Sequence, residues 1–176
     1  MMGTDFFILM KSELLLAVII FILLFIKVGN KEWKNEQVLN IVNVLLLINF
    51  IAGFIGNKEG MLFNDMFKTN QLIVLEKNIL NLGTFIISLQ AYSWLKDHKH
   101  VLEFYILLLA SLMGMFYMIS GGNLLMFYLG LELSTIPLAA LANFDLEKRK
   151  SSEAAFKLIM SSAFSSGLLL FGISMI

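Results

Sequence analysis

The chain has 176 residues, of which 59% are hydrophobic and only 15% are charged, and its mean hydropathy is +0.83. Soluble domains are roughly 45–50% apolar and about 25% charged, so this composition indicates an integral membrane protein. Thirteen basic residues balance thirteen acidic ones, so no net field favours nucleic acid or an acidic substrate. The lack of cysteine excludes disulfides, thiolate nucleophiles and Cys-ligated metal centres.

Six segments are apolar enough to be candidates for membrane-spanning helices, each of which needs about 20 mostly apolar residues. They predict an all-α fold, a polytopic transmembrane helix bundle that forms one integral membrane region over residues 1–176. In chain order the segments are approximately 14–27, 38–55, 79–95, 104–119, 124–142 and 154–173.

Charged and turn-forming residues define several boundaries of these segments. Glu13 and Lys27 bound the first, and we expect both side chains to extend outward to the membrane interface. The third segment is the most polar, and we expect the preceding Glu76 and Lys77 to mark its interfacial end. The long apolar run that follows contains Ser-Gly-Gly-Asn at 120–123, a strong turn signal that splits it into two helices.

The distribution of lysine and arginine predicts the topology through the positive-inside rule. With six spans, these residues fall into two sets of loops. One set holds Lys27, Lys31, Lys34, Lys96, Lys99, Lys148, Arg149 and Lys150, and the other holds Lys11, Lys58 and Lys68, with Lys77 at its edge. The larger set predicts the cytoplasmic side, so we expect the N-terminus on the external side.

The two ends of the chain carry further expectations. No A-x-A cleavage site follows the first apolar segment, so we expect the first helix to be retained rather than removed as a signal peptide. At the other end, Ile176 closes an apolar run without a polar cap. That ending predicts that the chain is a fragment of a longer membrane protein.

Glu132 is the main candidate for chemistry, because it is an isolated carboxyl group in an otherwise apolar segment. A charge near the bilayer centre costs about 2.5–3.5 kcal/mol on insertion scales and marks a functional site by default. The alternative is a buried carboxyl that fixes helix packing through a hydrogen bond. Five residues later, Pro137 removes a backbone donor, which allows a kink or a water molecule near Glu132.

Glu153 and Lys157 form a second candidate site at the i, i+4 spacing, with the glutamate on the favoured N-terminal side. Continuing the same spacing adds Ser161 and Ser165, so one side of the helix is polar. Such a stripe suits a chain of proton-carrying groups and water. It suits equally well an interfacial ion pair followed by serines that let helices pack closely.

No other pattern in the sequence indicates a chemical site. His98 and His100 lie between charged residues, which favours a solvated loop over a metal site. The chain has no Gly-rich phosphate loop, nucleophile elbow or metal-ligand spacing. We therefore expect neither bond-making chemistry nor a bound metal in this chain.

Two motifs resemble one family. Phe127-Tyr-Leu-Gly-Leu-Glu-Leu-Ser-Thr-Ile-Pro137-Leu resembles the fifth-helix signature of subunit N of NADH-quinone oxidoreductase, respiratory complex I. Residues 152–157, Ser-Glu-Ala-Ala-Phe-Lys, and residues 165–172, Ser-Ser-Gly-Leu-Leu-Leu-Phe-Gly, are similar to its sixth helix. The first hundred residues share only the pattern of three hydrophobic helices.

The resemblance implies an antiporter-like, proton-translocating subunit of a bacterial inner-membrane enzyme, of which this chain would hold the N-terminal six of about fourteen helices. The family's essential fifth-helix glutamate falls on Glu132, and its sixth-helix glutamate and lysine fall on Glu153 and Lys157. These three residues would take part in proton translocation. The family's broken seventh helix and its later lysines would lie beyond Ile176.

The resemblance also implies where the redox chemistry would take place. We expect no cofactor in this chain, with NADH, flavin and iron–sulfur clusters on other subunits and quinone bound by the complex as a whole. The implied partners are the other membrane subunits and the lipid bilayer, and not nucleic acid. Two alternatives remain open: a subunit of a cation/proton antiporter or membrane-bound hydrogenase, and a structural or assembly protein in which Glu132 and Lys157 only fix helix packing.

Overall fold

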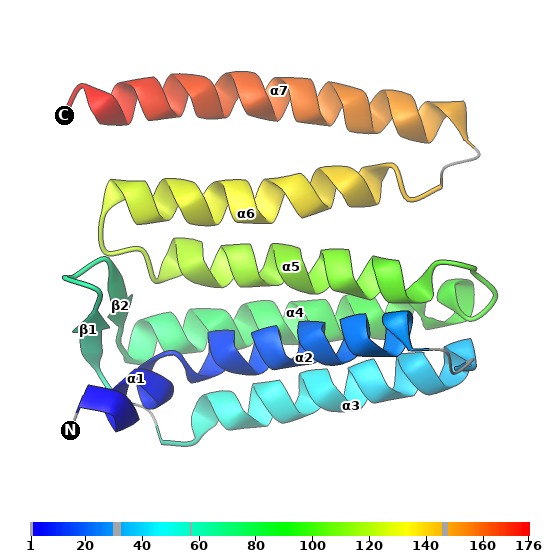
Figure 1. Ribbon diagram of the computed structural model, residues 1–176, viewed down its shortest axis with the longest axis horizontal. Coiled ribbons are helices and arrows are strands. Elements are labelled where there is room, and N and C mark those ends of the chain that lie inside the picture. The colour runs from blue at the N-terminus through cyan, green and yellow to red at the C-terminus, as the bar shows by residue number, and fades with distance from the viewer. Residues whose placement is uncertain (1, 30–32, 57, 146–147) are drawn as a thin grey trace.

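A computed structural model describes residues 2–29, 33–56, 58–145 and 148–176, with side chains from residue 6 onward. The chain forms a bundle of long, roughly parallel helices with a small hairpin at one end (Figure 1). The elements are α1 (Met2–Leu9), α2 (Lys11–Val28), α3 (Asn35–Phe54), β1 (Gly60–Leu62), β2 (Phe67–Thr69), α4 (Gln71–Leu95), α5 (Val101–Ile119), α6 (Leu124–Ala142) and α7 (Arg149–Ser174). The predicted all-α membrane bundle is confirmed.

Within the described ranges, five helices, α3 to α7, are long and apolar enough to cross a membrane. They contain most or all of the second to sixth predicted segments, and α6 has the predicted bounds of 124–142. The first predicted segment lies in α2, which runs alongside these helices (Figure 1). Because Lys11, Glu13 and Lys27 all belong to this 18-residue helix, the number of six spans stays a prediction.

The start of α4 differs from the expectation. The helix begins at Gln71 rather than at residue 79, and the side chain of Asn70 caps it by accepting a hydrogen bond from the Ile73 amide at 2.8 Å. Lys77 therefore lies inside the helix and is buried, so its predicted interfacial position is wrong. The physical reason is a partner on α2, described below, which offsets the cost of placing this charge inside the bundle.

The β-hairpin was not predicted from the sequence. β1 and β2 pair antiparallel, with Met61 opposite Lys68. The hairpin also bonds to the α5–α6 turn, because the Lys68 amide donates to the Ser120 carbonyl and the Gly122 amide donates to the Met66 carbonyl, both at 2.8 Å. It therefore lies across one end of the bundle, which we call the hairpin end (Figure 1).

The α5–α6 hairpin confirms the predicted split at 120–123 and packs unusually closely. A Cβ atom placed on Gly114 of α5 would lie 2.3 Å from the Ser134 amide nitrogen of α6. One placed on Gly130 would lie 2.4 Å from the Met118 amide nitrogen. The two backbones are thus in contact at two levels, which fixes the rotation of α6 about its axis.

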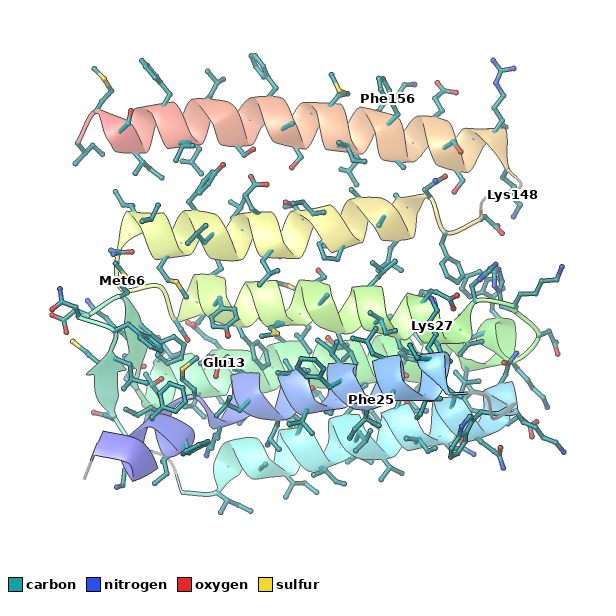
Figure 2. All side chains as sticks on the ribbon, viewed as in Figure 1. Glu13, Phe25, Lys27, Met66, Lys148 and Phe156 are labelled. Carbon is teal, nitrogen blue, oxygen red and sulfur yellow. The ribbon has the colours of Figure 1, made fainter. Side chains whose placement is uncertain are left out.

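The opposite end of the bundle, here the charged-loop end, gathers the α2–α3, α4–α5 and α6–α7 connections (Figure 1). Lys27 lies 3.2 Å from Glu103 there, and the hydrogen bond from Lys148 lowers the pKa of Asp145. Lys27 and Lys148 are both seen at this end in Figure 2. Successive connections therefore lie at opposite ends of the bundle, as the predicted topology requires. Lys31 lies outside the described residues, and the assignment of the charged-loop end to the cytoplasm stays a prediction.

Candidate functional site

Glu132 lies in the middle of α6, which continues through Pro137 without a break. Its side chain is half-buried, and the Oε1 atom is buried without a hydrogen-bond partner among the described residues. The nearby hydroxyls of Ser134 and Thr135 donate to the carbonyls of Leu131 and Glu132 in their own helix. No described hydrogen bond therefore fixes this carboxyl, which weakens the packing alternative.

Glu153 and Lys157 form the ion pair that their spacing predicts, with Nζ 2.6 Å from Oε1. Their side chains are 60% and 73% exposed, and Ser161 and Ser165 farther along the stripe are exposed too. Leu158 and Ser162, by contrast, line a small cavity of about 180 Å³ against α6. The polar stripe therefore lies on a face of α7 that the described part of the chain does not cover.

The structure does not bring Glu132 and Lys157 together. The antiparallel register is fixed by Ser151, whose hydroxyl donates to the Ala142 carbonyl at 2.7 Å. The Ser151–Ala142 bond places Lys157 opposite about residue 136, and Thr135 and Leu138 of α6 share a cavity with Leu158 and Ser162. That level is about four to six residues from Glu132, or about 6–9 Å along the helix axis at 1.5 Å per residue, and no described contact joins the two side chains.

A further charged pair was missed. Glu13 on α2 and Lys77 on α4 lie 2.5 Å apart, with only 1% and 2% of their side chains exposed. The Lys77 ammonium also lies 5.0 Å from the centre of the Phe67 ring of β2. The prediction that Glu13 extends outward to the interface is therefore wrong: it lies inside the bundle at the hairpin end (Figure 2), where Lys77 stabilises its charge.

The pair belongs to a polar side of α4 that faces the bundle interior. Asn81 donates from Nδ2 to the Leu46 carbonyl of α3 at 3.3 Å. Ser88 donates to Oδ1 of Asn43 at 2.6 Å and lies 2.8 Å from the Tyr105 hydroxyl of α5. The buried polar residues Lys77, Asn81, Thr84 and Ser88 repeat every three to four residues. This spacing was the available signal, because a polar stripe in a membrane helix faces protein rather than lipid.

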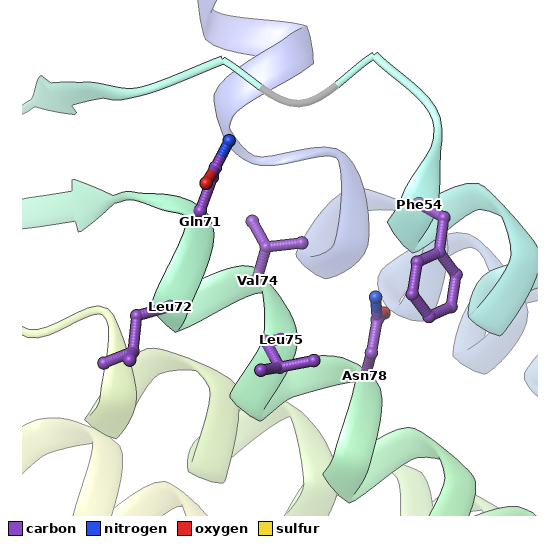
Figure 3. A pocket seen from close by; sticks show the side chains of 6 residues that line it. All are labelled: Phe54, Gln71, Leu72, Val74, Leu75 and Asn78. Atoms are coloured by element: carbon purple, nitrogen blue, oxygen red, sulfur yellow. The ribbon is translucent and has the colours of Figure 1, made fainter.

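A groove at the hairpin end reaches this polar side of α4. It has a volume of about 520 Å³. Figure 3 shows the side chains that line it: Phe54 at the end of α3 and Gln71, Leu72, Val74, Leu75 and Asn78 on α4. Asn78 is itself only 4% exposed and is the neighbour of Lys77 in sequence. The groove ends at Asn78, and neither Glu13 nor Lys77 lines it.

The two histidines lie at the charged-loop end. His98 Nε2 is 3.7 Å from Asp145, and its ring packs against Phe144 with centroids 4.7 Å apart. His100 Nδ1 is 3.2 Å from Glu103. In the described ranges, no group of three or more His, Cys, Asp or Glu side chains is arranged to hold a metal ion.

Comparison with known proteins identifies relatives over nearly the whole chain. Residues 121–176, which include Glu132, Glu153 and Lys157, match a family model described as NADH:quinone oxidoreductase/Mrp antiporter, TM. The chain is 41% identical over 174 residues to NADH-quinone oxidoreductase subunit N of Phocaeicola vulgatus, covering 95% of this chain and 36% of that protein. It is also 41% identical to subunit N of Azobacteroides pseudotrichonymphae over 174 residues, covering 96% of this chain and 36% of the relative.

A more distant relative shows the same relationship. Subunit N of Pelagibacter ubique is 37% identical over 168 residues, which cover 93% of this chain and 35% of the relative. The chain thus spans about a third of the length of the curated relatives it matches. The matches begin well before the two motifs of α6 and α7, so the diverged first hundred residues are included. The chain belongs to the family of NADH-quinone oxidoreductase subunit N.

Proposed function

We propose that the chain is part of a proton-translocating membrane subunit that couples electron transfer from NADH to quinone with proton transport. One observation carries this proposal: Glu132 places a buried oxygen without a described partner in the middle of a membrane-crossing helix. An intramembrane carboxyl of this kind is energetically costly, and it therefore marks a functional site by default. The redox chemistry is assigned to other subunits of the complex, and this chain contributes to the membrane part.

The arrangement suggests separate roles for the two candidate sites. Glu132 has a buried oxygen without a described hydrogen-bond partner, so its proposed role is proton transfer. Lys157 is paired with Glu153 on the uncovered face of α7, so its proposed role is to present a positive charge toward whatever covers that face. The two sites then act at different depths, with Glu132 as the deeper one.

Replacing Glu132 by glutamine in the full-length subunit tests the proposal. The amide keeps the size and hydrogen-bonding ability of the carboxyl but loses the titratable proton. We expect proton pumping linked to NADH oxidation, measured in membrane vesicles at equal complex content, to fall by about tenfold or more while assembly is retained. Ser134→Ala, which removes a hydroxyl bonded within α6, is the matched control and should leave pumping unchanged. If the Glu132→Gln variant pumps protons as fast as the wild type, Glu132 has a packing role instead.

A second candidate function follows from the description of the matching family model, which also includes an antiporter. In that case the same residues would exchange a cation for protons without NADH oxidation. The named relatives, which are subunits of NADH-quinone oxidoreductase, favour the first function. Vesicles energised by NADH distinguish the two, because an antiporter subunit would show cation-dependent proton movement when no NADH is present.

A further inference from the structure

A second groove runs along the outer side of α2 and α3 and shares no lining residue with the groove in Figure 3. Its volume of about 550 Å³ lies within the range of about 300–1,000 Å³ typical of small-molecule sites. Lys11 lines it together with apolar side chains, among them Leu14 and Val18 of α2 and Ala52 of α3. In the described ranges, Lys11 is the one lining residue that is not apolar. We call this the α2–α3 groove.

The α2–α3 groove begins at the hairpin end and extends toward the middle of the bundle. Lys11 is the first residue of α2 and Ile55 follows the last residue of α3, so both lie at the hairpin end (Figure 1). Val18 is seven residues farther along α2, or about 10 Å at 1.5 Å per residue. That distance is about a third of a hydrocarbon core of about 30 Å. The groove therefore follows the helices into the bilayer, which is also the direction of an acyl chain.

The described part of the chain leaves the α2–α3 groove open. The side chains of Val18 and Ile55, which line its two ends, are 53% and 67% exposed. The groove is also far from the polar stripe of α7, because α3 and α7 lie at opposite edges of the bundle (Figure 1). An occupant of the groove would therefore contact neither Glu153 nor Lys157.

Lys11 places a positive charge at the hairpin end of this apolar groove. Its ammonium donates a hydrogen bond to the Ile55 carbonyl, which holds the cation at the C-terminal end of α3, where the helix dipole favours it. This capping explains the bond but not the apolar groove beside it. A lysine near a membrane surface attracts anionic lipid headgroups by about 1 kcal/mol. The cation and the groove together therefore match the charge and the shape of an anionic phospholipid.

We propose that the α2–α3 groove binds one phospholipid, with its anionic headgroup against Lys11 and one acyl chain along Leu14, Val18 and Ala52. The headgroup is recognised through its charge, and the chain through apolar contact with both helices. The lipid fills the surface between α2 and α3 and so joins the two helices. The inference does not rest on the proposed function, because its test detects contact with lipid and not pumping.

Photo-crosslinking of the full-length subunit in lipid nanodiscs provides the test. Two probes carry the same acyl chain with a photoactivatable diazirine: phosphatidylglycerol, which is anionic, and phosphatidylcholine, which is zwitterionic. Mass spectrometry of the digested subunit measures the label on residues 11–18 and 52–55. At equal mole fractions we expect phosphatidylglycerol to give about fivefold more label there, which corresponds to about 1 kcal/mol for one basic residue.

Variants of Lys11 test the recognition of the headgroup. Lys11→Gln should reduce labelling by phosphatidylglycerol to the level of phosphatidylcholine, whereas Lys11→Arg, which keeps the charge, should retain the preference. Lys68→Gln is the matched control, because it removes a lysine of the hairpin that does not line the groove. Equal labelling of the wild type by the two probes would overturn the proposal. An equal loss of preference in Lys11→Gln and Lys68→Gln would also overturn it.

A variant of the groove wall tests the position of the acyl chain. Ala52→Trp should fill the groove and reduce the label on residues 11–18 from both probes. Val44→Trp, at a position of α3 that is 55% exposed and outside the groove, should leave it unchanged. Wild-type labelling of Ala52→Trp would overturn the proposal, and so would a wild type without label on residues 11–18, because protein would then cover the groove. If Ala52→Trp does not fold, the Lys11 variants decide the outcome.

Discussion

Glu13 and Lys77 illustrate how a residue's position in the sequence can mislead about its environment. Both are near the ends of apolar segments, where charged side chains normally extend to the interface. Both are instead at most 2% exposed, because each provides the counter-ion of the other across α2 and α4. Glu132, an isolated charge inside an apolar segment, could be identified from the sequence alone. The Glu13–Lys77 pair could not, because it depends on which two helices pack together.

Breaking the buried pair on one side should be far more costly than removing it entirely. We expect Lys77→Met to destabilise the full-length subunit by about 3–5 kcal/mol, because an unpaired carboxylate stays buried. Glu13→Gln/Lys77→Met should restore most of that stability, since no buried charge remains. Thermal unfolding of the purified subunit measures both. Equal destabilisation by the single and the double variant would contradict this account, and Lys157→Met on the exposed pair should change stability by less than about 1 kcal/mol.

Glu132 and Lys157 share no contact or partner in the described ranges, which predicts that their contributions to stability are independent. Sites more than about 7–10 Å apart without shared partners usually add within about 0.3–0.5 kcal/mol. We therefore expect Glu132→Gln and Lys157→Ala to show additive changes in unfolding free energy in a double-mutant cycle. An interaction energy above about 1 kcal/mol would indicate that the two residues meet in the full-length subunit.

At the scale of elements, the close contact between α5 and α6 depends on two glycines. Gly114→Ala should destabilise the subunit by about 1–3 kcal/mol, because its Cβ atom would meet the backbone of Ser134 and neither helix can move easily. Gly167→Ala is the matched control on α7, where a Cβ atom meets nothing within 4 Å. Unfolding temperatures of the two variants provide the comparison. Similar unfolding temperatures for the two variants would mean that α5 and α6 can move apart without loss of stability.

The helices themselves could be predicted well where the apolar pattern alone defines them. α6 has the predicted ends because Asn123 caps its start and no charge interrupts the pattern near its boundaries. α4 begins eight residues before the predicted segment because Asn70 caps its start and the buried Lys77 lies within the helix. The hairpin could not be predicted, since its three-residue strands depend on contacts with Ser120 and Gly122 from a distant part of the chain.

At the scale of the whole molecule, the arrangement of connections predicts the result of a topology experiment. Reporter fusions after Lys34, Lys99 and Lys150 should give cytoplasmic signals, because these sites lie at the charged-loop end. Fusions after Lys58 and Gly122 should give external signals, because they lie at the hairpin end. The fusion partner must be active on only one side of the membrane, so that its signal reports the side on which each fusion site lies. Opposite signals at two or more sites would reverse the orientation.

The bond between the hairpin and the α5–α6 turn also sets an order of events during synthesis. The Lys68 amide has its acceptor on Ser120, about fifty residues later in the chain, so β2 emerges from the ribosome long before this contact can form. Both strands of the hairpin are therefore complete before the turn that holds them against the bundle has been synthesised.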